Sequence, residues 1–420
     1  MMFDKETLQT LLNLPDIAID RVVLGERKTL KIYVHSTLDG THCHCCGQPI
    51  DHYYGLGKEI ELRHLPLFDY RVILVLRPKR YQCRSCDGRP TTSQTLSWYT
   101  SRASVTNAFE QQMLLELINS TLEDVSRKQA LGVDALQGIL DRNMACEVNW
   151  DTIETLEVIG IDEMALKKGH RDFIAVISAY INGTLQVIGL LGERTKAAVE
   201  KFFSSIPKRL RRTVKVVCSD LYQGFIGAAK AVFGQRVLIC ADRFHIAKLY
   251  REGLETLRKR EWKRLRRTLS NADLNQFKNV HWILRHRRAD LNADERRILN
   301  RLFARSPKLK DAYEACEALT AIYESRLSKG QGKRKLRGWM QRVTNRKLTC
   351  FDRFLGTLNT HFEDITNYFV GRHTSGFVEG LNNKLKVLKR RCYGITNLTH
   401  LYQRVCLDLN GYARFGVDAL

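Results

Sequence analysis

The chain lacks any apolar run long enough to cross a bilayer, since its longest apolar stretches are of the length of Val72–Leu76. It also lacks the basic-then-apolar pattern of an export signal, and its first residues include Asp4, Glu6 and Asp16 instead. These two absences argue against a membrane-spanning or exported protein. The sequence therefore predicts a cytoplasmic protein with no membrane partner.

A disulfide framework is not expected, although the chain has 12 cysteines, because the cytoplasm keeps thiols reduced. Seven of them are scattered singly in apolar or helical segments, where a small buried side chain is the ordinary role of cysteine. These seven are Cys146, Cys218, Cys240, Cys316, Cys350, Cys392 and Cys406. The other five are clustered near the N-terminus and predict a different chemistry.

Acidic residues are scarce relative to basic ones, with 45 Asp and Glu against 68 Lys and Arg and a net charge of +23. The excess is clustered: Gln331–Cys350 has seven basic residues and no acid, and Arg258–Arg267 has seven basic residues and one acid. Solubility needs far less charge, so this clustering favours a nucleic-acid partner. With 420 residues, 44% of them hydrophobic, the chain is expected to form several separate cores.

Two Cys-x-x-Cys pairs near the N-terminus predict a structural zinc ribbon. The pairs are Cys43 with Cys46 and Cys83 with Cys86. Strand-like residues 59–67 and 70–77 lie between them, so that two tight turns offer four thiolates to one tetrahedral ion. The identity of the ligands stays open, because Cys45, His42 or His44 could replace a neighbouring cysteine.

Three helices are predicted between residues 99 and 149. The first spans 106–119 by its apolar period, the second starts at the N-cap Thr121, and the third spans 134–143 with Asp134 as its cap. Two helices joined by a short turn with glycine are typical of a DNA-binding helix-turn-helix, although any small three-helix bundle has the same pattern. The candidate DNA contacts are Arg127, Lys128, Gln137 and Arg142.

From residue 150 the pattern changes to strands alternating with helices. The strands are predicted at 156–161, 172–180, 184–191, 214–219 and 236–241, and the helices at 196–204 and 222–233. Asn182-Gly183 predicts a hairpin between the second and third strands. The order β-β-β-α-β-α-β is that of an RNase H-like sheet, whose first and fourth strands are neighbours. Because Asp162 and Asp220 follow those two strands, we expect their carboxylates to meet at one edge.

A long, basic, mostly helical segment from Arg243 to about Phe369 is expected to interrupt this sheet and to grip DNA. Its candidate DNA contacts are Lys333, Arg334, Lys335 and Arg337. Trp339, within the same cluster, is either a core residue or a platform for an unpaired base.

The sheet fold is expected to resume at Thr374, with a helix that carries Glu379. Asn382, Asn383 and Lys386 share one face with this acid. Arg390 and Arg391 follow and are further candidates for contact with DNA. An acid, two amides and a lysine form a face suited to a metal and a phosphate.

Taken in order, these motifs resemble the DDE transposases of bacterial insertion sequences, specifically the ISL-three family. The motifs are Gly160-Ile161-Asp162-Glu163, Lys167-Lys168-Gly169-His170, Ser219-Asp220, Ala241-Asp242-Arg243-Phe244-His245, Glu379-Gly380-Leu381-Asn382-Asn383-Lys384 and Arg391-Cys392-Tyr393-Gly394. The zinc ribbon and the helix-turn-helix also fit that family's plan. The resemblance covers nearly the whole chain.

The resemblance implies a metal-dependent enzyme that nicks and joins DNA at the terminal inverted repeats of an insertion sequence. It makes Asp162, Asp220 and Glu379 the triad that binds two Mg²⁺ (or Mn²⁺) ions. Asp242 is also a strand-end acid and stays an alternative to Asp220 as a direct ligand. We assign Asp242 and His245 to support of the site or to contact with the scissile DNA. Asn383 and Lys386 are also assigned to support of the site.

The expected fold is a multidomain α+β chain with an RNase H-like core interrupted by an all-α insertion. The expected domains are a zinc ribbon at 1–98, a helix-turn-helix at 99–149, the first part of the core at 150–244, the basic insertion at 245–370 and the rest of the core at 371–420. The expected partners are double-stranded repeat and target DNA in the bacterial nucleoid, with a homodimer or larger assembly on DNA because two ends must meet. A non-catalytic DNA-binding regulator and a nuclease that cuts but never joins are the alternatives.

Overall fold

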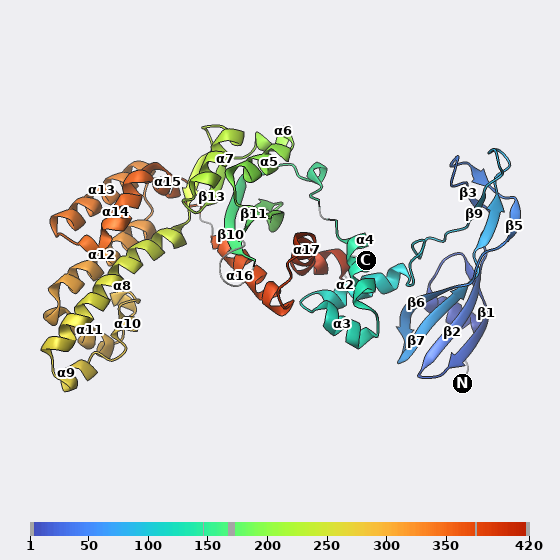
Figure 1. Ribbon diagram of the computed structural model, residues 1–420, viewed down its shortest axis with the longest axis horizontal. Helices are drawn as coiled ribbons and strands as arrows, with labels where there is room; N and C mark the ends of the chain where they lie inside the picture. Colours follow the sequence, from blue (N-terminus) through green and yellow to red (C-terminus); the bar gives the residue numbers. More distant parts are fainter. Residues whose placement is uncertain (1–3, 146, 167–172, 374–375, 417–420) are drawn as a thin grey trace. The chain divides into compact units, whose positions relative to one another are not determined.

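The computed structural model describes residues 4–145, 147–166, 173–373 and 376–416. The contacts divide the chain into two compact units, residues 1–145 with 406–420 and residues 146–405 (Figure 1). Across the described ranges, no helix combines the length and the apolar character that a bilayer span needs. The motif Lys167–His170 and the expected helix start Thr374 lie outside the described residues.

The first unit begins with a short helix and three small sheets. The helix is α1 (Lys5–Leu12). The strands are β1 (Ile17–Gly25), β2 (Thr29–Ser36), β3 (Thr41–His42), β4 (Pro49–Ile50), β5 (Tyr53–Leu56), β6 (Ile60–Leu67), β7 (Tyr70–Leu76), β8 (Lys79–Gln82) and β9 (Thr91–Ser93). They form sheets of order β1-β2-β7-β6, β3-β4 and β5-β8-β9. The strands expected between the cysteine pairs are thus present as β6 and β7.

Three helices complete this unit around their own apolar core: α2 (Asn107–Leu117), α3 (Leu122–Gln129) and α4 (Val133–Asn143). Thr121 caps α3 as expected, since its side chain accepts a hydrogen bond from the Asp124 amide. The expected cap at Asp134 is wrong. The α4 helix begins one residue earlier, its N-cap is Gly132, and Asp134 lies in the first turn, where a carboxylate still favours the helix dipole.

The second unit contains a five-stranded sheet of order β12-β11-β10-β13-β14. Its strands are β10 (Val158–Ala165), β11 (Phe173–Ile181), β12 (Thr184–Leu191), β13 (Val216–Ser219) and β14 (Leu238–Ala241). The first three strands are antiparallel, whereas β10–β13 and β13–β14 are parallel. The β13 strand is buried throughout, as a parallel strand covered on both faces must be. The expected pairing of the first and fourth strands is observed.

The turn between β11 and β12 follows its sequence signal. Asn182 and Gly183 have φ values of 50° and 75°, the left-handed pair that a type I′ hairpin turn requires. The helices α5 (Lys196–Ser205) and α7 (Gln223–Phe233) pack on the sheet within one apolar core, with the short helix α6 (Lys208–Arg211) between them. A 3-10 turn, η1 (Trp150–Thr152), precedes the first strand.

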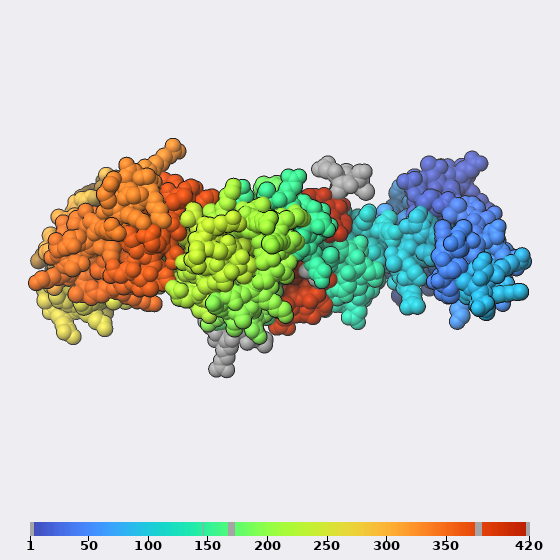
Figure 2. All heavy atoms as spheres, turned by 90° about the horizontal axis from the view of Figure 1, so that it is seen from above, coloured from blue at the N-terminus to red at the C-terminus, as the bar shows by residue number. Residues whose placement is uncertain are grey.

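The helical insertion begins directly at the end of β14 and has its own apolar core. In Figure 2 its helices form the closely packed body coloured from yellow to orange. They are α8 (Arg243–Thr268), α9 (Asn271–Asn275), α10 (Val280–Ile283), α11 (Ala293–Arg305), α12 (Pro307–Glu324), α13 (Lys329–Asn345), α14 (Asp352–Thr360) and α15 (Phe362–Thr366), with 3-10 turns at Arg288–Asp290, Thr349–Phe351 and Asn367–Phe369.

Trp339 belongs to the core of this insertion. Its ring is 1% exposed and lies 5.8 Å from the Phe351 ring and 5.6 Å from the Phe354 ring, centroid to centroid. Its Nε1 donates a 2.7 Å hydrogen bond to the Ala315 carbonyl. Of the two expected roles, core packing is therefore the one observed.

Two helices follow the insertion, α16 (Gly376–Arg391) and α17 (Leu398–Phe415). The α16 helix contacts β10 of the sheet. In α17 the residues up to Val405 belong to the second unit and those from Cys406 to the first.

Candidate active site and metal centres

Three aspartates lie at the same level on three neighbouring elements of the sheet, one residue past the parallel pairing of β10, β13 and β14. Ile161 on β10 is level with Ser219 on β13, and Ser219 is level with Ala241 on β14. The next residues in the chain are Asp162, Asp220 and Asp242, respectively. The parallel ladder thus brings three carboxylates to one edge, where the carboxyl ends of parallel strands open a crevice.

The sequence led us to expect that Asp162 would follow the end of its strand, and this expectation is wrong. The β10 strand runs on to Ala165 because its antiparallel pairing with β11 continues past the end of β13, with Asp162 opposite Val176. Asp162 is therefore past the end of the β13 ladder but still inside the β11 ladder. The longer pairing holds its backbone more firmly than a loop would.

Burial opposes the ionisation of these acids. It raises the pKa of Asp162 to about 6, and the nearby charges of Asp220 and Asp242 act in the same direction. Burial also raises the pKa of Asp220, again with a contribution from Asp242. Carboxylates that are close together and buried repel one another when ionised, so a nearby positive charge stabilises them.

His245, in the first turn of α8, supplies part of that charge when it is protonated. Its Nδ1 lies 3.3 Å from Asp242 Oδ2. This contact with Asp242, together with the charges of Asp162 and Asp220, raises the pKa of His245. Asp242 also fixes the start of α8, since its Oδ1 accepts a 2.8 Å hydrogen bond from the Phe244 amide. The candidate supporting pair therefore lies beside the two candidate ligands.

The α16 helix is attached to the same edge of the sheet by two side chains. Asn382 Nδ2 donates to Asp162 Oδ2, and Lys389 Nζ donates to the Ala165 carbonyl at 2.7 Å. Glu379 lies on this helix one turn before Asn382, although its side chain lies outside the described residues. The helix of the third expected acid therefore reaches the edge where the other two lie.

The sequence placed Asn382 on the same face as Asn383 and Lys386, but only Asn383 and Lys386 were assigned a supporting role. Asn382 is 3% exposed, whereas the assigned Asn383 and Lys386 are exposed. The signal was present, because Asn382 is three residues after Glu379 and three before the buried Leu385, on the inward face of an amphipathic helix.

The guanidinium of Arg194 is a further positive charge at this edge. The sequence analysis did not single this residue out. Its Nη1 lies 2.6 Å from Glu163 Oε2. Its guanidinium is 4.7 Å from the Phe173 ring centroid and 5.9 Å from that of Tyr222. Glu163, next to Asp162, is thus engaged with an arginine whose guanidinium also lies against two aromatic rings.

The donor set at this edge suits a hard divalent cation. It consists of carboxylate oxygens together with Asn382 Oδ1, which is buried and accepts no hydrogen bond within the described part of the chain. The described carboxylates are not yet convergent, because among described residues only cysteine-containing groups place three or more donor atoms within 4.8 Å of one another. A cation here would therefore need the carboxylates to move closer, or a further ligand.

The four expected cysteines of the N-terminal unit do converge. Cys43, Cys46, Cys83 and Cys86 have sulfur atoms within 4.8 Å of one another. The Cys43–Cys86 and Cys46–Cys83 sulfur separations are 4.0 and 3.8 Å. A tetrahedron with Zn–S bonds of about 2.3 Å has edges of about 3.8 Å, so the cluster has the dimensions of a zinc site.

The thiols of this cluster also have the electrostatics of a zinc site. Backbone N–H groups of Cys46 and Cys45 lower the pKa of Cys43 to about 6. Hydrogen bonds to Cys46 and Cys83 raise the pKa of Cys86 above its ordinary value. Four adjacent thiolates repel one another unless a cation neutralises them. Cys45, in a second group with Cys43 and His44, remains an alternative ligand.

The expected DNA contacts of the first unit differ in whether their side chains are exposed or bonded to other residues of the protein. Arg127 and Lys128 are exposed in the last turn of α3. Gln137 donates to Asp141 at 2.9 Å. Arg142 binds the buried Glu110 with its Nε at 3.0 Å and so ties α4 to α2.

The expected DNA contacts of the second unit are mostly exposed. Arg334, Lys335 and Arg390 are exposed, and Arg391 is half-buried. Arg337 is also exposed, with its guanidinium 5.1 Å from the Phe362 ring centroid. Lys333 is engaged within the protein, since its Nζ lies 2.6 Å from Glu363 Oε1.

Comparison with known proteins gives evidence that is independent of the geometry of the site. Residues 159–405 match the family model of ISL3 DDE proteins, described as transposase. Residues 39–86 match the zinc-finger of transposase IS204/IS1001/IS1096/IS1165. The chain is 24% identical over 424 residues to the transposase for insertion sequence element IS1001 of Bordetella parapertussis, covering 98% of this chain and 100% of that one. It is 22% identical over 390 residues to the transposase for IS1557 of Mycobacterium tuberculosis, covering 88% and 86%.

The zinc site predicts that one thiol is essential and an adjacent one is not. Cys83→Ser should remove most of the zinc, about one ion per chain, because it breaks the tetrahedral set. Cys45→Ser is the matched control and should keep the ion. Zinc per chain in the purified proteins, measured by atomic absorption, checks both. Zinc loss in Cys45→Ser with retention in Cys83→Ser would move the ion to the group of Cys43, His44 and Cys45.

The raised pKa of Asp162 predicts that this residue destabilises the cation-free fold. The ionised form is disfavoured in the folded state, so the penalty is present at pH 8 and disappears as the pH falls from 6 towards 4. Asp162→Asn should therefore raise the free energy of unfolding at pH 8 by about 1–3 kcal/mol. The gain should shrink towards pH 4.

The measurement is urea unfolding without added Mg²⁺ or Mn²⁺ at both pH values. Asp151→Asn is the control, because the side chain of Asp151 is 98% exposed and its neutralisation should change little. A loss of stability in Asp162→Asn at pH 8 would contradict the electrostatic account.

Proposed function

The chain belongs to the ISL3 family of DDE transposases, and from this premise we propose that it cuts DNA at the terminal inverted repeats of an insertion sequence and joins the ends to target DNA with Mg²⁺ or Mn²⁺. The observation that carries this proposal is the hydrogen bond from Asn382 to Asp162. It joins the helix of Glu379 to the sheet edge of Asp162 and Asp220 across 220 residues of sequence.

We assign the sheet of the second unit to the RNase H-like fold. Three antiparallel strands followed by two parallel ones, in the order β12-β11-β10-β13-β14, support the assignment. In this reading the helical insertion separates Glu379 from the other two acids. We also assign α3 and α4 to a helix-turn-helix, supported by the exposed Arg127 and Lys128 on α3, and keep the five domain boundaries expected from the sequence.

In the proposed site Asp162, Asp220 and Glu379 would hold two divalent ions. Bound there, the ions would lower the pKa of a water or a 3′-hydroxyl and stabilise the leaving oxygen. The Asn382 amide orients the Asp162 carboxylate, and His245 holds Asp242 beside it. Arg194 offers a fixed guanidinium to a phosphate oxygen. No nucleophilic side chain is required.

The DNA partner follows from the proposed reaction and from the charge. Exposed Arg334, Lys335 and Arg337 on α13 offer phosphate contacts, and each contact should steepen the salt dependence of binding by about one unit of slope. Because two transposon ends must be brought together, we propose a homodimer or larger assembly on double-stranded DNA.

A strand-transfer assay separates this proposal from the two alternatives. A pre-cleaved terminal repeat, a plasmid target and Mg²⁺ are incubated with the protein, beside a cleavage assay on the intact repeat. The transposase gives joined DNA, a nuclease gives only cut repeats, and a regulator gives neither product.

Removal of any one acid of the triad should abolish cleavage while DNA binding persists. The variants are Asp162→Ala, Asp220→Ala and Glu379→Ala, and each leaves the cations without a full set of oxygen ligands. Asp151→Ala is the matched control, since it removes an exposed carboxylate near the same sheet. A gel-shift assay on one labelled repeat measures DNA binding, and a cleavage assay on the same repeat measures the loss of cleavage. Normal cleavage by Glu379→Ala would exclude that residue from the triad.

The role of the Asp242 carboxylate in the site can be tested separately from its role as the N-cap of α8. Asp242→Ser keeps a side-chain oxygen that caps α8 but removes the carboxylate that faces His245. A supporting role predicts that cleavage falls by about 10- to 100-fold, whereas Asp220→Ala gives none. Loss of all cleavage in Asp242→Ser, with a normal circular dichroism spectrum, would instead make Asp242 a direct ligand.

A further inference from the structure

A groove of about 910 Å³ follows helix α8 away from the acid row. It begins at Asp242 and Arg243, runs past Arg251 and reaches Arg258. Its far side is made by His281, Leu284 and Arg285, in and after the short helix α10. The groove is therefore continuous with the candidate active site at one end and enters the insertion at the other.

One exposed aromatic ring lines this groove, and a second is next to its lining residues in the chain. Phe244 lines the groove and is 51% exposed. Trp282 is not itself a lining residue, but it follows the lining residue His281 and is 54% exposed. The Arg285 guanidinium lies 4.8 Å from the Trp282 ring centroid. Large aromatic side chains usually bury most of their surface. Trp339 of the same insertion does so, whereas these two do not.

The groove carries more positive than negative charge. The basic side chains are Arg243, Lys248, Arg251, Arg258 and Arg285, and the acids are Asp242, Glu252 and Glu255. Glu255 is engaged by Arg258 at 2.6 Å, and Glu252 lies 3.9 Å from Lys248. Arg243 is also paired, with Glu324 outside the groove. The exposed Arg251 and Arg285 leave positive charge that favours an anionic ligand.

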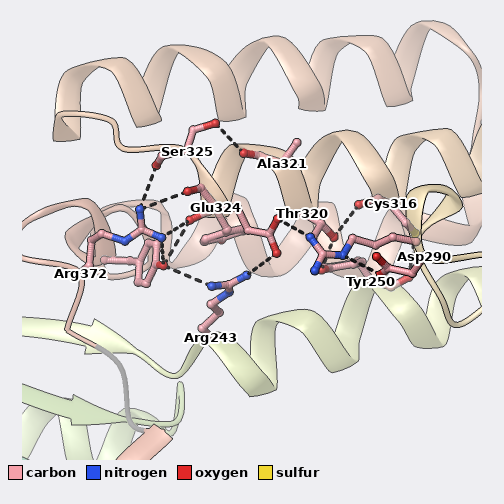
Figure 3. Close-up of polar contacts among 12 residues, drawn as sticks. Arg243, Tyr250, Asp290, Cys316, Thr320, Ala321, Glu324, Ser325 and Arg372 are labelled. Carbon is pink, nitrogen blue, oxygen red and sulfur yellow. Dashed lines mark hydrogen bonds and ion pairs between the residues drawn. The ribbon is translucent and has the colours of Figure 1, made fainter.

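The walls of the groove are held in place by the insertion. Figure 3 shows Arg243, at the first turn of α8, facing Glu324 at the end of α12. The Nη2–Oε1 distance is 3.7 Å, and Arg287 binds the other oxygen of Glu324 at 2.7 Å. Arg372 donates to the carbonyls of Glu324 and Ser325. The exposed Phe244 next to Arg243 is therefore presented by a fixed helix start.

We propose that this groove binds an unpaired segment of the DNA strand that adjoins the scissile phosphate, with Phe244 in the groove and Trp282 beside Arg285 stacking on its bases and the exposed basic side chains of the groove contacting its backbone. The proposal rests on the transposase function and names the state of the DNA that the site accepts. Exposed aromatic faces beside cations are the combination that single-stranded nucleic acid binds.

A paired duplex does not explain these rings. Its bases are stacked on one another, so that a protein reaches only phosphates and base edges in the grooves. An exposed phenylalanine gains little from either. Unstacking bases next to the scissile phosphate costs free energy, and stacking on Phe244 and Trp282 offsets part of that cost.

The test measures DNA binding by the full-length protein without added Mg²⁺ or Mn²⁺. The probes are a fluorescein-labelled oligothymidylate and a duplex of equal length, followed by fluorescence anisotropy. Trp282→Ala and Phe244→Ala should each weaken oligothymidylate binding by about 5- to 150-fold, the range for one lost base stack. Trp282→Phe is the matched control and should keep binding, because it retains an aromatic face. Duplex affinity should be unchanged in all three variants.

Two results would overturn the proposal. One is oligothymidylate binding by both alanine variants at parental affinity. The other is an equal loss of affinity for the duplex, which would make the groove a duplex site. Because both substituted rings are exposed, the variants should fold, and Trp282→Phe controls for that. The transposase function is judged separately by cleavage of the intact repeat: oligothymidylate binding that depends on Trp282 without any cleavage refutes the function and not the groove.

Discussion

The parallel pairing of β10, β13 and β14 is the constraint on which the rest of the site depends. The parallel register pairs Ile161 with Ser219 and Ser219 with Ala241, and so places the next residues, Asp162, Asp220 and Asp242, in one row. A shift of one residue in any strand would turn its aspartate to the other face of the sheet. The acid row is therefore set by backbone hydrogen bonds, and the side chains add to it only locally.

The repulsion and burial of these carboxylates destabilise their ionised forms, and the surrounding residues compensate for this only in part. Burial raises the pKa of both Asp162 and Asp220. His245, Asn382 and Arg194 surround the row with a cation, an amide and a guanidinium, yet each is drawn from a different element. Like charge held together at a sheet edge marks a functional site more than a stabilising one. The same physics applies to the cysteine cluster, where closeness of the four sulfurs raises the pKa of Cys86.

Sequence reasoning succeeded where a local pattern determines the structure. The Asn182-Gly183 turn, the two Cys-x-x-Cys pairs and the short apolar runs before Asp220 and Asp242 each depend on neighbours in the chain. It failed where a distant partner decides. The β10 strand passes Asp162 because β11 continues to pair with it, and Asn382 became the contact to Asp162 because its face of α16 is the buried one. Trp282 and Trp339 have similar basic neighbours, and only packing distinguishes the exposed ring from the buried one.

Helix α8 connects these observations, because it begins at the acid row and ends in the insertion. Its first residue, Arg243, follows the last acid of the row, so no flexible linker separates the sheet edge from the helix. Glu324 and its arginines then attach that first turn to α12. An insertion joined in this way cannot act as a loosely tethered DNA clamp. A strand of DNA lying along α8 would be positioned relative to the carboxylates by the same rigid element that carries Asp242, and small displacements of a phosphate from its ligands have large effects on rate. The insertion is thereby part of the geometry of the site and not an appendage to it.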